Sequence, residues 1–162
     1  MVSVEHEEYF AYGSNLDPVQ MKERCISAVK SYVAKLPDHV LDFPRRSEHR
    51  KGGVASVTTR VGSAVWGVVF AITPADLEKL DRHEGYRGAG SPELNAYNRQ
   101  KCIVHEAGDP SKPRTVWTYV ANPMGDYLPH RDYLALICRG ARHWKLPEDY
   151  LNELSRIKVC GE

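Results

Sequence analysis

The sequence predicts an α+β fold, and three observations support this class. Strand-like apolar runs occur through the first three quarters of the chain, two clear helix starts interrupt them, and the C-terminal segment shows helical spacing of its apolar residues. The chain has 162 residues and no repeat or low-complexity segment. We therefore expect a single domain, 1–162, large enough to bury one core.

Local signals place the first two elements. A strand is expected over 9–12, after an acidic N-terminal segment, residues 1–8, that we expect to be flexible. Asp17 is suited to cap a helix over 18–27, because proline follows at the first helical position and Gln20 stands where a capping box needs it. The chain is thus expected to pass from strand to helix within a few residues.

The middle of the chain contains runs that predict strands. The pair Pro37–Asp38 is typical of a turn and divides 28–43 into two short strands, and a polar, basic loop is expected over 44–53. The next two predicted strands cover 55–59 and 64–72. The second of these is nearly all apolar, so we expect it to be central, with Gly67 allowing close approach of another backbone segment.

A second helix start follows the central strand. Thr73 is the expected N-cap, and Gly85 is placed to end the helix. The remaining predicted elements are an insert over 87–96, strands over 97–106 and 115–120, and helices over 131–143 and 147–157.

Composition argues against several classes of function. Lys and Arg number 22 and Asp and Glu 21, for a net charge of +1, so no global field draws the protein to nucleic acid or to a membrane surface. No signal peptide or membrane-spanning segment is apparent. The four cysteines show no Cys-x-x-Cys spacing and are expected to be free thiols, which favours a soluble, cytoplasmic protein. These cysteines are Cys25, Cys102, Cys138 and Cys160.

The histidines and the basic cluster favour no particular function. The seven histidines form no pair with metal-ligand spacing, so we expect no metal and no cofactor. The basic cluster within 44–53 contains Glu48 and no interleaved aromatic residues, so a solvated loop is the better interpretation than a nucleic-acid site. The cluster comprises Arg45, Arg46, Arg50 and Lys51.

The Gly13-Ser14-Asn15 turn after the first strand is the first candidate site. A strand that stops at such a turn leaves backbone N–H groups without ladder partners, so they can point at a carboxylate or a phosphate. An ordinary surface turn has the same composition. The turn alone therefore indicates an anion site only weakly.

Glu84, in the last turn of the helix that ends at Gly85, is the second candidate. The negative end of a helix disfavours an anion, so a partly buried Glu84 should have a raised pKa, in the range useful to a general base. Asp81 is the competing carboxylate, and a solvated surface charge is the ordinary alternative for either residue. The residues alone leave this choice open.

Three blocks of the sequence resemble the gamma-glutamylcyclotransferase family. The first is the octet Tyr9-Phe10-Ala11-Tyr12-Gly13-Ser14-Asn15-Leu16, which matches the family's signature loop. The second is the Val65-Trp66-Gly67-Val68-Val69 strand with the Leu80-Asp81-Arg82-His83-Glu84-Gly85 helix ending. The third runs from Tyr133 to Ala141 and then from Leu146 to Tyr150. The three blocks have the order and spacing of the family, and together they span nearly the whole chain.

This resemblance implies a fold, a site and a reaction. The fold would be a small mixed β-barrel or a strongly twisted sheet with flanking helices. Glu84 would be the acid/base catalyst, the whole octet 9–16 would bind the substrate, and Tyr133 would line the pocket. Family members convert a gamma-glutamyl amine or amino acid into 5-oxoproline and a free amine, and relatives suggest that a homodimer is plausible.

The reaction explains why few protein groups are needed. The α-amine of the substrate attacks its own gamma-carbonyl, so holding the substrate folded supplies much of the rate. Glu84 could move the protons, and the turn amides could hold either the developing oxyanion or the α-carboxylate. Tyr12 and Tyr133 are candidate donors or pocket walls.

The insert over 86–96 departs from the family pattern, and the loops over 45–52 and 86–97 are the expected walls around the leaving amine.

Two alternatives stay open. The same scaffold could be a binding module that recognises a gamma-glutamyl or amino-acid-like ligand without turnover. It could also be a cyclotransferase specialised for gamma-glutamylamines or another acyl-amine. Retention of Glu84 argues against the binding module.

Overall fold

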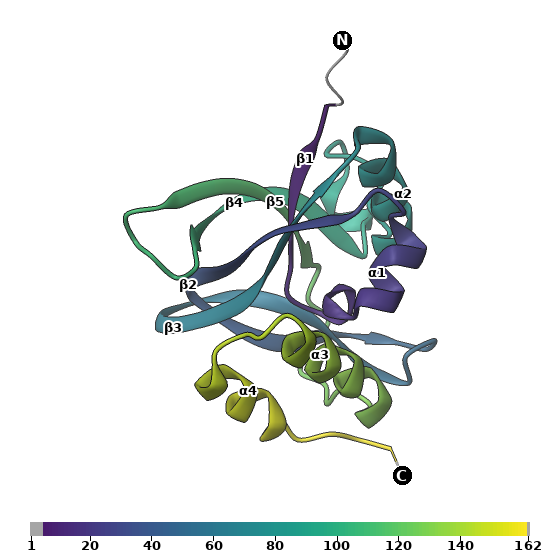
Figure 1. Cartoon of the computed structure of the whole chain (residues 1–162). Helices are drawn as coiled ribbons and strands as arrows, with labels where there is room; N and C mark the ends of the chain where they lie inside the picture. Colours follow the sequence, from purple (N-terminus) through teal and green to yellow (C-terminus); the bar gives the residue numbers. More distant parts are fainter. Residues whose placement is uncertain (1–4, 162) are drawn as a thin grey trace.

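A computed structural model describes residues 5–161, and five strands in it close into a barrel (Figure 1). The order around the barrel is β1-β3-β2-β4-β5, with β1 parallel to β5 and the other pairs antiparallel. The strands are β1 (Glu7–Ala11), β2 (Val29–Ser47), β3 (Gly52–Ile72), β4 (Tyr97–Glu106) and β5 (Pro113–Ala121). The predicted α+β class and mixed barrel are confirmed.

Strand β1 begins two residues earlier than predicted. Glu7 pairs with Ile72 and Glu8 with Ala71, so these two residues, assigned from sequence to a flexible N-terminus, belong to the barrel. Residues 1–4 of that segment lie outside the described part of the chain. The apolar centre of β1 is fully buried at Phe10 and Ala11, which anchors the turn that follows.

The long hairpin of β2 and β3 replaces the four short strands predicted between 28 and 72. At Pro37–Asp38 the chain does not reverse: Asp38 adopts a φ of 57° and the register with β3 shifts between Pro37 and His39. Between the pairs on either side, β2 has the single residue Asp38 and β3 has four, 60–63, so the irregularity accommodates extra residues of β3 while pairing continues on both sides. The predicted 44–53 loop is also shorter, because 44–47 belong to β2 and 52–53 to β3.

The predicted role of Gly67 is confirmed. A Cβ atom at this position would lie 2.2 Å from the Ala11 carbonyl oxygen and 2.8 Å from the Phe10 ring. Strand β3 is paired with β1 on one side and β2 on the other, so it is central as expected. The missing side chain lets β1 lie directly against β3 and fixes where the following turn begins.

The helices pack around the barrel and extend below it (Figure 1). They are α1 (Pro18–Arg24), α2 (Pro74–Glu84), α3 (Arg131–His143) and α4 (Glu148–Ser155), with 3₁₀ turns η1 (Ser14–Leu16) and η2 (Pro92–Leu94). The caps of α1 and α2 are as predicted: Asp17 accepts from the Gln20 N–H and Thr73 from the Asp76 N–H. Helix α1 ends three residues before the predicted boundary.

Helix α3 supports the turn after β1 from behind. A Cβ on Gly140 would lie 2.2 Å from the Leu16 carbonyl carbon, so the helix axis can approach the turn only at a glycine. The Trp144 indole N–H donates to the Leu16 carbonyl at 2.8 Å, and the Arg139 Nε donates to the Asp17 carboxylate at 2.6 Å. The start of α1 and the turn are therefore held in one position.

Candidate active site

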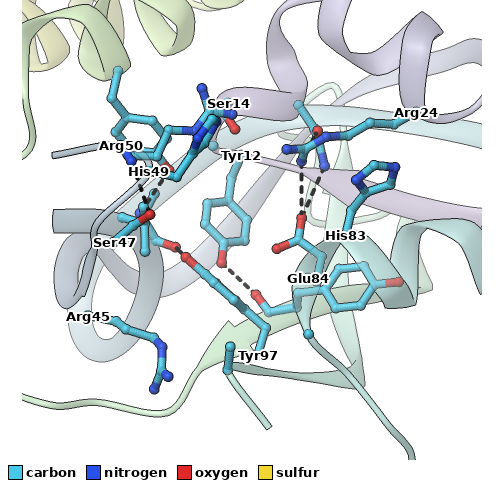
Figure 2. Close-up of a pocket in the computed structure, with 18 of the residues that line it drawn as sticks. Tyr12, Ser14, Arg24, Arg45, Ser47, His49, Arg50, His83, Glu84 and Tyr97 are labelled. Carbon is cyan, nitrogen blue, oxygen red and sulfur yellow. Dashed lines mark hydrogen bonds and ion pairs between the residues drawn. The ribbon is translucent and has the colours of Figure 1, made fainter. Parts of the chain in front are cut away.

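A cavity of about 390 Å³ opens beside the turn after β1 (Figure 2). Its walls come from that turn, the end of α2, the β2–β3 hairpin, the start of β4 and helix α3. This volume is in the range of small-molecule sites, roughly 300–1,000 Å³. The lining includes Tyr9, Tyr12, Gly13, Ser14, Asn15, Glu84 and Tyr133, which are residues predicted from the sequence.

Glu84 is the last residue of α2 and projects into this cavity. Gly85 ends the helix in the left-handed conformation, with a φ of 69°. One carboxylate oxygen of Glu84 accepts from the Asn15 side-chain amide at 3.3 Å and lies 3.8 Å from Arg24 Nη1 (Figure 2). Only 15% of the Glu84 side chain is exposed, so these two groups are its main polar surroundings.

The pKa of Glu84 is raised above its ordinary value. Burial is the largest cause, and it is partly opposed by the Arg24 charge, the Asn15 hydrogen bond and the Arg50 charge. The rise in this pKa was predicted correctly from the sequence. The predicted cause was the negative end of the helix, whereas the largest cause is burial. A carboxyl that is costly to ionise yet in contact with cationic and amide donors can accept a proton and return it.

Asn15 is the hub of the hydrogen bonds around Glu84. Its side-chain NH₂ donates to Glu84 and to the Tyr9 hydroxyl, the latter at 3.0 Å. Its side-chain oxygen accepts from Gln20 at 2.9 Å and from Arg24 at 3.0 Å. With both donors and the acceptor engaged, the amide has one favourable orientation, and Glu84 is held by a fixed donor.

Gln20 joins the turn to the β2–β3 hairpin. The predicted capping box is wrong, because the Gln20 side chain does not return to the start of its helix. It donates to the Ser14 hydroxyl at 2.8 Å as well as to Asn15, and it accepts from Arg50 Nη2 at 2.7 Å. These three side-chain hydrogen bonds, to two separate elements, replace the local cap.

The backbone of the turn presents donors. Within residues 5–161, the N–H groups of Gly13, Ser14 and Asn15 donate to no protein acceptor, whereas those of Leu16 and Asp17 close the 3₁₀ turn onto Gly13 and Ser14. The prediction that this turn leaves amides without partners is thus confirmed, and binding of an anion by them stays a prediction.

Tyr12, Tyr97 and Tyr133 are among the tyrosines that line the cavity, and their hydroxyls make different hydrogen bonds. Tyr12 donates to the Tyr119 carbonyl at 2.5 Å and Tyr97 donates to the Ala55 carbonyl at 2.6 Å, so both protons are committed. The Tyr133 hydroxyl instead accepts from the Ala55 N–H at 2.9 Å. Burial raises the pKa of Tyr133 to about 12, so its proton is retained at neutral pH and can be donated to a ligand.

The structure separates other predicted residues from the cavity. Phe10, Ala11 and Leu16 have no exposed surface and do not line it, so they support the turn instead of touching a ligand. Asp81, the competing carboxylate, accepts from the Tyr119 hydroxyl at 2.6 Å and pairs with Arg99 at 3.3 Å, outside the cavity. Glu84 is the carboxylate that the fold brings to the turn.

Several site residues were missed from sequence. Arg24 follows Gln20 by four residues, so both lie on one face of α1, a spacing that could have drawn attention to them. The basic cluster is not simply a solvated loop, because Arg45 and Arg50 are half-buried in the cavity wall. Of the two expected walls, 45–52 lines the cavity through five of its residues, whereas 86–97 reaches it only at Ala96 and Tyr97. That these walls surround the leaving amine stays a prediction.

Residues 5–161 show no sign of a metal site or of a membrane-spanning helix. No group of three His, Cys, Asp or Glu side chains in this part of the chain is arranged to hold a metal ion. None of its helices is long and apolar enough to cross a membrane. The four cysteines are all free, as predicted.

Proteins of known family resemble this chain in sequence and in fold. Residues 64–154 match the AIG2-like family. The chain is 32% identical over 154 residues to gamma-glutamylcyclotransferase of Mus musculus and, equally, to that of Homo sapiens, in each case covering 93% of this chain and 78% of the relative. A solved gamma-glutamyl cyclotransferase structure has a TM-score of 0.87 at 30% identity, covering 98% of this chain and 91% of that one.

The match to the AIG2-like family covers more than half of the chain, and the identity to the mouse and human enzymes extends over nearly all of it. Together with the shared barrel, these similarities show that the chain belongs to the gamma-glutamylcyclotransferase family.

Proposed function

We propose that this enzyme cyclises a gamma-glutamyl amine or amino acid to 5-oxoproline and releases the free amine, with Glu84 as general acid and base. The observation that carries the proposal is the position of Glu84. Among the described cavity-lining residues it is the one carboxylate, and Asn15 holds it at 3.3 Å beside three turn amides without protein partners.

The proposed reaction begins with proton removal. The substrate's α-ammonium gives a proton to the ionised Glu84, and the resulting amine attacks the gamma-carbonyl carbon to form the five-membered ring. As the tetrahedral intermediate develops, the ring nitrogen gives its second proton to solvent water, because Glu84 still holds the first. The departing nitrogen takes a proton from Glu84, the carbon–nitrogen bond breaks, and the free amine then takes up a further proton from water.

Two negative charges of the substrate need partners. One is the α-carboxylate of the glutamyl group, and the other is the oxyanion that forms at the gamma-carbonyl. The turn amides of Gly13, Ser14 and Asn15 and the Tyr133 hydroxyl are the donors available for them. Fixed donors that need no rearrangement stabilise a developing charge more than water does.

The cellular setting follows from the thiols. Four free cysteines in the chain fit a reducing compartment, so we infer that the enzyme acts in the cytoplasm. The homodimer implied by the family resemblance stays a prediction.

A substrate panel tests the proposal. Purified protein is incubated with several gamma-glutamyl amino acids, glutathione and gamma-glutamyl-lysine, and 5-oxoproline is measured directly. We expect release from at least one substrate. Binding of the panel without any release would instead support the binding module, and turnover of gamma-glutamylamines alone would indicate a cyclotransferase specialised for them.

A further inference from the structure

The cavity has a second end, formed by the β2–β3 hairpin. We call the part around Asn15, Arg24 and Glu84 the turn end and the part around Arg45 and Arg50 the hairpin end. In the view of Figure 2, Arg45 and Arg50 lie on the side away from Arg24 and His83, with Tyr12 and Tyr97 between. The cavity lining contains five arginines but only one carboxylate, so its charge is strongly positive.

Three of these arginines are accounted for without a ligand. Arg24 lies 3.8 Å from Glu84. Arg46 forms an ion pair with Glu48 on the hairpin and is 44% exposed. Arg82 is exposed on α2 and also faces a separate surface hollow. The positive charge that needs a further explanation is therefore that of Arg45 and Arg50.

Arg45 and Arg50 are half-buried cations without an acidic partner. Among residues 5–161, no carboxylate oxygen lies within 4.0 Å of either guanidinium. Arg45 makes one long hydrogen bond, 3.4 Å, to the Asn122 carbonyl, which leaves most of its donors free. Arg50 donates to Gln20 and lies over the Tyr133 ring at 5.5 Å from its centre. Burial and the Arg24 charge both lower the pKa of Arg50.

The hairpin positions both side chains. The register of β2 with β3 shifts between Asp42 and Arg45, and a shift of this kind redirects the side chains that follow it. The turn of the hairpin is fixed by the Ser47 hydroxyl, which accepts from the Arg50 N–H at 3.1 Å. The two guanidinium groups are thus held at the cavity wall by backbone structure.

We propose that Arg45 and Arg50 are specificity-determining residues that select a leaving amino acid with two carboxylates. This inference rests on the proposed function. Arg50, whose charge acts on Glu84, is assigned to the α-carboxylate of the leaving amino acid. Arg45, whose charge is not among those acting on Glu84, is assigned to the side-chain carboxylate. A guanidinium binds a carboxylate through two parallel hydrogen bonds, which suits both positions.

The charges of the complex agree with this assignment. Glu84 and the turn amides accommodate the α-ammonium and α-carboxylate of the glutamyl group, so a neutral leaving amine would leave two half-buried cations unpaired. One carboxylate on the leaving amino acid neutralises one of them, and a second carboxylate neutralises the other. Unpaired charge away from bulk water is costly, so the doubly acidic ligand is favoured.

The test compares gamma-glutamyl-glutamate with gamma-glutamyl-glutamine, which differ in one carboxylate and hardly in shape. We expect wild-type kcat/KM to favour the glutamate by about tenfold, mainly through KM, as for a charge-assisted hydrogen bond. In Arg45→Gln the ratio should fall to about one, and Arg45→Lys should give an intermediate ratio. The control is Arg60→Gln, which removes the same charge from an exposed residue of β3 that does not line the cavity. This variant should keep the wild-type ratio of kcat/KM values.

Each contrary result has a distinct meaning. A wild-type ratio below about threefold would overturn the inference while the cyclotransferase function stands. An Arg45→Gln variant that loses activity equally on both substrates would assign Arg45 a structural role only and would also overturn it. If Arg45→Gln does not fold, the wild-type ratio of kcat/KM values and the ratio for Arg45→Lys still test the inference. Absence of 5-oxoproline from both substrates, with the broader panel also negative, would remove the proposed function itself.

Discussion

At the turn end of the cavity, Asn15 has both side-chain donors and its acceptor in hydrogen bonds, whereas at the hairpin end the Arg45 guanidinium makes a single bond of 3.4 Å. The turn end is thus complete without a ligand, and the hairpin end is not. This difference indicates that the geometry of the reacting groups is set by the fold, while the charge of the far end is left for the substrate to satisfy. Groups that the fold holds in place stabilise the transition state, whereas charges that the fold leaves unpaired favour a ligand that can pair with them.

Replacing Asn15, the hub of the turn end, should separate the two ends most clearly, because it should lower both activity and stability. In Asn15→Leu, Glu84 loses its amide donor, and both Gln20 and Arg24 lose their acceptor. We expect kcat to fall by about 10- to 100-fold and the free energy of unfolding by about 1–3 kcal/mol, because buried polar groups are left unpaired. Steady-state kinetics and thermal unfolding measure the two effects.

The matched change at the hairpin end should behave differently. Arg45→Gln removes no ion pair, so its free energy of unfolding should stay within about 0.5 kcal/mol of wild type. If Arg45→Gln were as destabilising as Asn15→Leu, the two ends would not differ in the way described.

A smaller effect is expected on the pH dependence. Glu84 must be ionised to act as a base, so kcat/KM should fall as the pH drops through its pKa, which burial raises. The Arg24 charge lowers that pKa, so Arg24→Gln should move the acidic limb of the pH profile to higher pH. An unchanged limb would argue that Glu84 is not the group that titrates.

The control for this shift is a nearby cation on the same helix. Lys22→Gln carries the same change of charge on α1, and Lys22 is exposed and does not line the cavity. Its pH profile should match that of wild type. A similar shift in both variants would point to a general electrostatic effect rather than to contact with Glu84.

The sequence was most informative where local chemistry decides the structure. Asp17 marks the start of α1 because its side chain caps the helix, and Gly85 marks the end of α2 because a left-handed conformation is needed there. Gly67 was recognised because a strand interior rarely holds glycine without a close neighbour. The Gly13-Ser14-Asn15 turn and Glu84 were candidates from local chemistry, the family resemblance favoured Glu84 over Asp81, and the fold brings the turn and Glu84 together.

Features that depend on tertiary pairing could not be predicted in this way. Pro37–Asp38 has the composition of a turn, but pairing with β3 on both sides makes it a bulge inside one strand. Gln20 fits a capping box, yet Ser14, Asn15 and Arg50 offer its side chain better partners. Arg50 has the sequence context of a solvated loop, and only the hairpin register places it in the cavity wall.

The central claim is that the Glu84 carboxylate moves the protons of a substrate that the rest of the cavity holds. The most direct measurement is 5-oxoproline release by Glu84→Gln, with substrate affinity measured on the same preparation by calorimetry. We expect release to fall by about a thousandfold or more while substrate binding stays measurable, because general acid–base catalysis contributes on the order of 10²–10⁴. Release by the Gln variant within about tenfold of wild type would contradict the assignment of Glu84.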